Sequence, residues 1–180
     1  MTTVLNQTQY VYLKKEKSPK VLVNALDLLG VKEIVGPRHN KQIMEWATEL
    51  GLSRIYTSDE IPWCGLFIAK VIKDSDYEVV KDPLWARNWA NFGNKQTEAM
   101  LGDILVFTRG GGGHVGIYVG EDATCYHVLG GNQGNMVNIS RIEKSRCISI
   151  NRSPWKIGQP ANVRPIKLKV INGIISKNEA

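Results

Sequence analysis

The chain has 180 residues, of which 43% are hydrophobic and 22% are charged, as in a globular domain that buries its own core. Its net charge of +6 and pI of about 9.2 favour an anionic partner, although lysines spread over a solvated surface would give the same values. The basic residues form no compact block with interleaved aromatics, so no nucleic-acid partner is expected. No apolar run is long enough to cross a bilayer, so stable membrane insertion is not expected either.

The three cysteines have no paired spacing, which argues against a disulfide framework and indicates synthesis in a reducing compartment. Residues 1–10 are polar and lack the basic start and apolar stretch of a signal peptide. We therefore expect synthesis in the cytoplasm without a signal peptide. A monomer is also expected. Action outside the cytoplasm would then require release or delivery by other means.

The sequence divides into an N-terminal arm (1–20), a central domain (21–155) and a C-terminal extension (156–180). We expect the arm to be loose or to form an edge strand. The extension has Val170, Ile171, Ile174 and Ile175 among lysines, which favours an added strand or helix.

Helices are expected early in the central domain and strands late. Apolar stripes at helical spacing predict helices over 20–29, 40–50 and 63–72. A loop with two tryptophans follows over 83–89. Apolar runs between glycine-rich turns predict strands over 104–107, 114–119, 125–129, 136–139 and 147–151. Helices followed by an antiparallel meander indicate an α+β fold.

Two residues could form a nucleophile and its base. Cys64 lies where a loop meets a predicted helix, and the partial positive charge of a helix N-terminus favours the thiolate. A small buried core cysteine is the alternative interpretation. His114 opens a strand after four glycines, which leave room for a substrate backbone, and a surface histidine in a turn is the alternative there. Their order along the chain is that of papain-like enzymes.

A third group should orient the imidazole through its second nitrogen. Asn132, in the segment Gly130–Gln133, and His127, within the preceding predicted strand, are the two candidates, and Asn132 is favoured. A zinc site built from Cys64, His114, Cys125 and His127 is the weaker alternative, because their spacing matches no common zinc pattern. We therefore expect no metal and no cofactor.

Other residues near Cys64 are candidates for binding a substrate. Trp63, Trp85, Glu60 and Gly113 are assigned this role, and Trp89 is a further aromatic that could line a cleft. The acidic pair Asp59-Glu60 is interpreted first as helix-capping charge, with a calcium ligand or a contact to a substrate amine as alternatives.

Several blocks of sequence resemble the NlpC-type and CHAP-type peptidoglycan hydrolases, over roughly Ala25 to Pro154 and in the family's order. The nucleophile block is EIPWCGLFI, the histidine block is GHVGIYVG, and LGDILVF lies between them. The blocks ARNW, VLGGNQGN and GVKEIVGP also have counterparts, the last two in a subgroup common in phage and bacterial genomes. Many NlpC-type enzymes have a third histidine near the position of His127, whereas Gly130 stands where CHAP-type enzymes often have an acid.

The resemblance implies a papain-like α+β fold, a catalytic triad of Cys64, His114 and a polar residue, and bacterial peptidoglycan as substrate. An endolysin and a secreted antibacterial effector both fit, the latter with an inhibitor or immunity protein as a partner. The alternatives are a non-catalytic domain that binds the cell wall or another protein, and an acyltransferase on the same scaffold.

Overall fold

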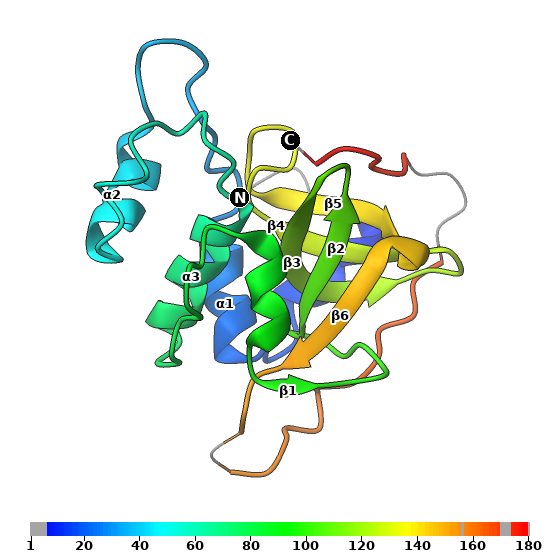
Figure 1. Ribbon diagram of the computed structural model, residues 1–180. Helices are drawn as coiled ribbons and strands as arrows, with labels where there is room; N and C mark the ends of the chain where they lie inside the picture. Colours follow the sequence, from blue (N-terminus) through cyan, green and yellow to red (C-terminus); the bar gives the residue numbers. More distant parts are fainter. Residues whose placement is uncertain (1–6, 156, 170–173, 180) are drawn as a thin grey trace.

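The computed structural model describes residues 7–155, 157–169 and 174–179 (Figure 1). Helices gather on one side of an antiparallel sheet, and the predicted α+β class is confirmed. The helical elements are η2 (Thr8–Lys14), α1 (Lys20–Asp27), α2 (Lys41–Glu49), α3 (Cys64–Asp74), η3 (Ala86–Asn91) and η4 (Lys144–Arg146). The three predicted helices therefore form close to their expected bounds.

The sheet has the strand order β1-β6-β2-β3-β4-β5, and every neighbouring pair is antiparallel. The strands are β1 (Asn94–Lys95), β2 (Ile104–Arg109), β3 (Gly112–Glu121), β4 (Cys125–Gly130), β5 (Asn138–Glu143) and β6 (Cys147–Arg152). The hairpin β2–β3 and strand β4 form the centre of the sheet, so His114 on β3 has a rigid mount.

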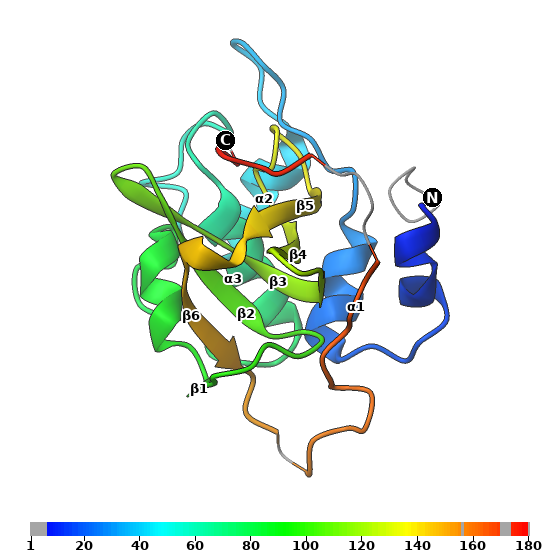
Figure 2. The ribbon, with the colours of Figure 1, turned by 90° about the vertical axis from the view of Figure 1, so that its right-hand side faces the viewer.

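Helix α3 is the most buried helix because apolar residues surround most of it. Only Lys70, Lys73 and Asp74 lie outside its buried set, and Lys70 bonds to Glu49 at 2.7 Å. The helix packs against β3 on one side and against α1 and α2 on others. Figure 2 shows α3 behind the sheet when the molecule is turned by 90°. Its first turn, with Cys64, is therefore held against the strand that carries His114.

A buried ion pair joins the beginning of β2 to the end of β6. Arg152 donates to both carboxylate oxygens of Asp103, at 2.9 and 2.8 Å, and both side chains are almost fully buried. Burial acts to raise the pKa of Asp103, whereas the Arg152 contacts act to lower it. Asp103 of the LGDILVF block therefore has a structural role in the sheet.

The two ends of the chain are more closely packed than the sequence suggests. Residues 8–14 form the 3-10 helix η2, with Tyr10 and Leu13 buried, so the prediction of a loose arm or an edge strand is wrong. In the extension, isolated parallel bridges join Lys167 to Glu121 and Ser176 to Ile142. Beyond these bridges, the described part of the extension contains no strand or helix. Val170 and Ile171 of the predicted added element lie outside the described residues.

Two smaller differences concern the middle of the chain. The predicted tryptophan loop ends in the 3-10 helix η3, and the fourth predicted strand begins at Asn138 instead of Met136. Within the described residues, no helix is both long and apolar enough to traverse a lipid bilayer.

Candidate active site

Cys64 is the first residue of α3 and is 2% exposed. Gly65 follows it where the helix start meets the loop before η3. A Cβ atom at this glycine would lie 2.3 Å from the carbonyl oxygen of Pro83, so a larger residue could not approach as closely. The close approach places Cys64 beside Leu84 and Trp85 at the wall of a pocket.

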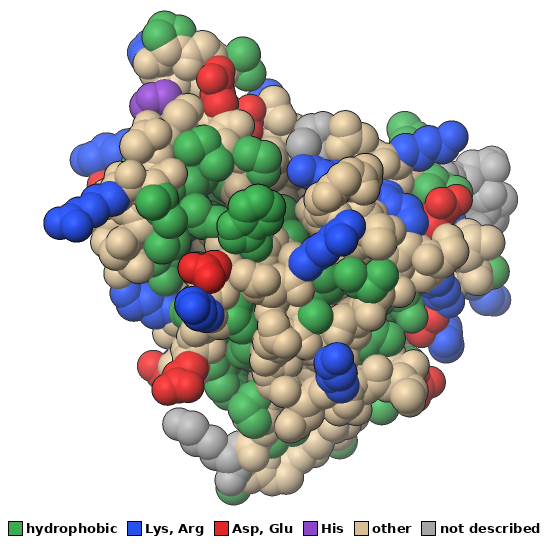
Figure 3. All heavy atoms as spheres, in the orientation of Figure 1, with side chains coloured by type: hydrophobic (Ala, Val, Ile, Leu, Met, Phe, Trp, Pro, Cys, Tyr) green, Lys and Arg blue, Asp and Glu red, His purple; other side chains and the backbone are tan. Residues whose placement is uncertain are grey.

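The pocket beside Cys64 has a volume of about 340 Å³. Apolar residues form one wall, and Arg109, Gly112 and Gly113 of the β2–β3 hairpin form another; the apolar set is Ile61, Pro62, Leu84, Trp85 and Ala86. Trp85 is 72% exposed, which makes its ring available to a bound molecule. Figure 3 shows apolar side chains gathered in a patch on the face of the molecule seen in Figure 1.

His114 lies on β3 and is fully buried. Its Nε2 atom is 3.0 Å from Oε1 of Gln133. The Gln133 amide nitrogen donates to the carbonyl oxygens of Val128 (3.1 Å) and Asn138 (2.7 Å), so the amide oxygen must face the ring. Nε2 of His114 is therefore the protonated nitrogen, and Nδ1 carries the lone pair. Nδ1 is buried and has no hydrogen-bond partner among the described residues.

Burial determines the charge state of both candidate catalytic groups. It raises the pKa of the Cys64 thiol, against the effects of the Val115 backbone N–H and the Arg109 charge. It lowers the pKa of His114 to about 4, against the effects of the Glu179 charge and the Gln133 hydrogen bond. Both groups are consequently neutral near pH 7.

The structure brings Cys64 to the strand of His114 but does not join the two side chains. The backbone N–H of Val115, the residue after His114, is near enough to the thiol to act on its pKa. Among the described residues no hydrogen bond links the thiol to the imidazole. Gln133 and His114 are therefore joined, and Cys64 lies on the helix packed against the same strand without a hydrogen bond to the ring.

The predicted contact between Asn132 and His114 is wrong, since Gln133 occupies this position. Asn132 is buried and has a φ of 54°, a left-handed conformation that turns the chain and directs the next side chain to the ring. Gly130 leaves the space, because a Cβ atom there would lie 2.8 Å from Oε1 of Gln133 and 3.2 Å from Nε2 of His114. The strand pattern carries no signal for this local turn.

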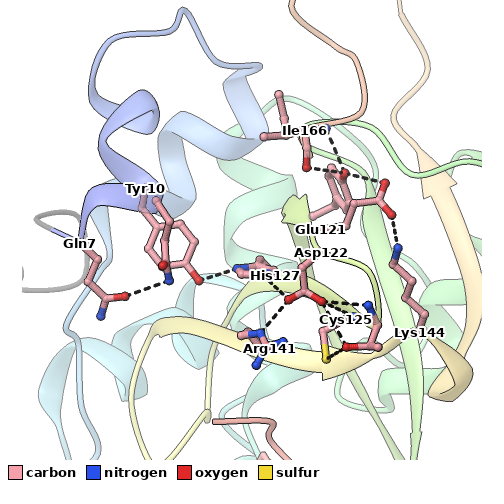
Figure 4. Close-up of polar contacts among 12 residues, drawn as sticks. Gln7, Tyr10, Glu121, Asp122, Cys125, His127, Arg141, Lys144 and Ile166 are labelled. Atoms are coloured by element: carbon pink, nitrogen blue, oxygen red, sulfur yellow. Dashed lines mark hydrogen bonds and ion pairs between the residues drawn. The ribbon is translucent and has the colours of Figure 1, made fainter. Parts of the chain in front are cut away.

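His127, the other candidate for the third role, belongs to a different network (Figure 4). The Tyr10 hydroxyl lies 2.6 Å from its Nδ1, and Asp122 Oδ2 lies 2.9 Å from its Nε2. Arg141 also donates to Asp122, at 2.8 Å. Figure 4 shows Tyr10 and Asp122 on opposite sides of the ring. Both nitrogens are thus engaged away from His114.

The same network bears on the zinc alternative. Two of its four candidate ligands, Cys125 and His127, lie on β4, where His127 is held by Tyr10 and Asp122. Across the described residues, no group of three or more histidine, cysteine, aspartate or glutamate side chains is arranged to hold a metal ion.

The acidic pair before Cys64 organises a loop. Asp59 is fully buried and accepts hydrogen bonds from the backbone N–H groups of Asn40 (2.7 Å) and Ile34 (3.0 Å) and from His39 (3.1 Å). Burial acts to raise the pKa of Asp59, but these hydrogen bonds lower it overall. Glu60 accepts from the backbone N–H of Gly36 at 3.2 Å. The pair therefore braces the segment between α1 and α2.

The predicted substrate-binding residues have different positions. Trp85 and Gly113 line the pocket, whereas Glu60 does not. Trp63 is fully buried, packs on Trp46 and donates to Glu33 at 2.9 Å, so its assignment to substrate contact is wrong. Trp89 is likewise buried and donates to the carbonyl of Pro83. Of the tryptophans considered, Trp85 alone is available to a ligand.

The sequence predictions did not include three polar residues of this site: Gln133, Arg109 and Glu179. Gln133 lies in the GGNQG segment, next to the favoured Asn132. The sequence thus indicates the segment that contacts His114 but not the residue that makes the contact. Arg109 lies across the β2–β3 turn from His114, whereas Glu179 comes from the far end of the chain, and only the fold reveals its charge near His114.

No family model matches this chain, and no curated protein sequence matches it significantly.

Proposed function

We propose that this protein is a papain-like cysteine hydrolase that cleaves amide or peptide bonds of bacterial peptidoglycan. The observation that supports this proposal best is the pair of groups near the start of α3. Cys64 lies beside a pocket, and His114 has one nitrogen bonded to Gln133 and the other without a partner among the described residues. A buried imidazole with a free lone pair carries an energetic cost. A role as the base for a neighbouring thiol accounts for that cost.

The proposed reaction has two stages. Cys64 Sγ attacks the amide carbonyl carbon while its proton passes to His114 Nδ1, and the backbone N–H of Cys64 stabilises the oxyanion. The C–N bond then breaks, and the leaving amine takes the proton from His114. Water attacks the resulting thioester and gives a proton to Nδ1, which returns it to the thiolate as the acid product leaves. Gln133 keeps the proton on Nε2 throughout.

The proposal requires the thiol and Nδ1 to come within hydrogen-bond distance when substrate binds. Catalytic hydrogen bonds are often looser without substrate, so the lack of a bond to Nδ1 among the described residues is compatible with the mechanism. Trp85 and the apolar wall of the pocket would contact the peptide, and the net charge of +6 would favour an anionic wall polymer. The sequence blocks support peptidoglycan, with an endolysin or a delivered effector as the setting.

The test uses isolated bacterial cell walls. The wild type should lower their turbidity, Cys64→Ala should not, and Cys125→Ala, a matched change of another buried cysteine, should retain activity. Mass spectrometry of the released fragments identifies the bond that is cut. Activity should persist in EDTA, because thiolate acyl transfer needs no Lewis acid. Undiminished hydrolysis by Cys64→Ala would refute the proposal.

A second candidate, a non-catalytic wall-binding domain, is favoured by the burial of both Cys64 and His114. It predicts that the wild type sediments with walls and releases no fragments, and that Cys64→Ala sediments equally. The fragment assay therefore separates the two candidates.

A further inference from the structure

Residues 174–179, here called the strap, return from the far end of the chain to the candidate active site. The strap joins the edge of the sheet through the backbone N–H of Ser176, which donates to the carbonyl of Arg141 on the edge strand β5 at 2.8 Å. It ends at Glu179, whose side chain is fully buried. A buried carboxylate requires strong partners, so the contacts of Glu179 indicate what it does.

Arg146 of η4 is the main partner of Glu179. Its Nη1 and Nη2 atoms donate to the two carboxylate oxygens, each at 2.8 Å. Nε of Arg146 donates to the carbonyl of Thr108 at 3.0 Å, and Thr108 pairs with Gly113 in the β2–β3 hairpin. The guanidinium therefore fixes Glu179 against the hairpin that carries His114.

A second contact reaches the loop that holds Gln133. The backbone N–H of Gly134 donates to the carbonyl oxygen of Glu179 at 3.0 Å. Gly134 directly follows Gln133, whose amide oxygen accepts from His114. The strap thus contacts both segments that determine the position of the imidazole, the hairpin and the loop.

We propose that Glu179 is a positioning residue of this site: it orders the loop that carries Gln133 and supplies a fixed negative charge for the protonated form of His114. This inference rests on the proposed cysteine mechanism, in which His114 holds a proton in each stage. Without a nearby anion, a buried imidazolium would pay a large desolvation cost.

The charges around His114 agree with this role. Burial lowers its pKa, the Glu179 carboxylate raises it, and Arg109 of β2 and Arg146 of η4 lower it further, while Cys64 of α3 is neutral. Burial also acts to raise the pKa of Glu179, but Arg146 and His114 lower it overall, so the carboxylate stays ionised. Glu179 is the anion that acts on the ring most strongly.

The experiment measures alkylation of Cys64 by iodoacetamide at pH 7, with the modified peptide identified by mass spectrometry. The fraction of thiol that passes its proton to His114 depends on the difference between the two pKa values. Glu179→Gln removes the charge and keeps the shape, so alkylation should slow by about 3- to 10-fold, as expected for a pKa change of half to one unit. Glu179→Asp keeps the charge and should stay within about twofold of wild type.

Glu16→Gln is the matched control, because it removes the charge of another carboxylate, which pairs with Arg164. It should leave alkylation unchanged. If the strap merely covers the site, Glu179→Gln should have the opposite effect on the alkylation rate, because a loosened strap would expose Cys64 and speed alkylation. Unchanged or faster alkylation in Glu179→Gln overturns the inference. A Glu179→Gln protein that fails to fold also overturns it, because the Glu179–Arg146 ion pair would then be needed for folding and not for positioning the site.

The alkylation assay uses no cell-wall substrate, so it is independent of the proposed substrate. If the wild type does not hydrolyse walls but Glu179→Gln slows alkylation as expected, the substrate proposal fails and the role of Glu179 stands. If walls are hydrolysed and alkylation is insensitive to Glu179, the substrate proposal stands and the role of Glu179 fails.

Discussion

Two buried histidines on neighbouring strands have opposite hydrogen-bonding states. His127 on β4 has both ring nitrogens occupied, by Tyr10 and Asp122. His114 on β3 has one nitrogen on Gln133 and one with no partner among the described residues. Burial lowers the pKa of both rings, and the Asp122 carboxylate opposes this at His127 much as the more distant Glu179 does at His114.

Under the proposed mechanism, the comparison separates a structural histidine, His127, from a catalytic one, His114. A fully satisfied imidazole in a network with an ion pair, Asp122–Arg141, is what a stable core requires. At His114, the ring nitrogen without a partner among the described residues is a local cost, which the proposed role as a base would explain. The expected consequence is that mutations at the two rings affect different properties of the protein.

The largest expected effect is on activity. His114→Ala removes the proposed general base and should lower wall hydrolysis by about 100- to 10,000-fold. His127→Ala should leave the rate within about threefold of wild type, but should cost about 2–4 kcal/mol of stability, because a buried ring is removed and the Tyr10 hydroxyl and Asp122 each lose a hydrogen bond. Fragment-release rates and urea unfolding curves measure both quantities. The assignment of the two roles would be reversed if His127→Ala lost activity and His114→Ala kept it.

The next effect is on stability in acid. The pKa of His114 is lowered to about 4 in the folded state, from an ordinary value of 6.5. The folded state therefore binds fewer protons than the unfolded chain between these values, and stability falls as the pH drops from about 6.5 to about 4. The full loss is roughly 3 kcal/mol, since each pKa unit is worth about 1.4 kcal/mol.

His114→Gln removes this titration, so the difference in unfolding free energy between pH 7 and pH 4.5 should shrink relative to wild type. Urea unfolding at the two pH values measures it. His127 and the carboxylates titrate in both proteins and cancel in the comparison. Parallel pH dependences in wild type and variant would contradict the lowered pKa.

The third effect concerns the orientation of the ring. Gln133→Ala should lower hydrolysis by about 10- to 100-fold, because the imidazole loses the contact that fixes its tautomer and angle. Asn132→Ala is the adjacent control and should have a smaller effect on the rate, since no hydrogen bond joins Asn132 to the His114 ring. Rates measured at saturating wall concentration make the comparison. Equal losses of rate in the two variants would mean that activity depends on the conformation of the loop and not on the Gln133 contact with the ring.

Much of the fold could be predicted because its signals are local. Apolar periodicity predicts α1, α2 and α3, and apolar runs between turns predict β2, β3, β4 and β6. The position of Cys64 at a helix start and of His114 at a strand start follow from the same signals. Long-range packing carries no such signal, which is why the arm was predicted to be loose although Tyr10 reaches His127 across the sequence.

The details of the site depended on geometry that sequence patterns do not encode. The left-handed backbone at Asn132 moved the contact with His114 by one residue, to Gln133. Trp63 and Trp85 are two positions with the same side chain close to Cys64, yet one is buried and one is 72% exposed. The helix at Cys64 turns Trp63 into the core, and the adjoining loop leaves Trp85 at the pocket.

The smallest expected effect tests the comparison of the histidines directly. Tyr10→Phe removes the hydroxyl that donates to Nδ1 of His127, so the ring acquires the same unsatisfied nitrogen that His114 has. This should lower the free energy of unfolding by roughly 1–2 kcal/mol, the cost of an unpaired buried polar atom. Tyr77→Phe is the control and should change stability little, because no residue in the described part of the chain forms a hydrogen bond with the Tyr77 hydroxyl. Urea unfolding at pH 7 measures both variants, and wall hydrolysis should stay at the wild-type rate in each.

The two outcomes for Tyr10→Phe have different consequences for His114. A loss of stability without a loss of activity would show that an unpaired imidazole nitrogen on β4 only destabilises the protein. Unchanged stability would mean that the fold tolerates such a nitrogen, and the unpaired nitrogen of His114 would then be weaker evidence for catalysis.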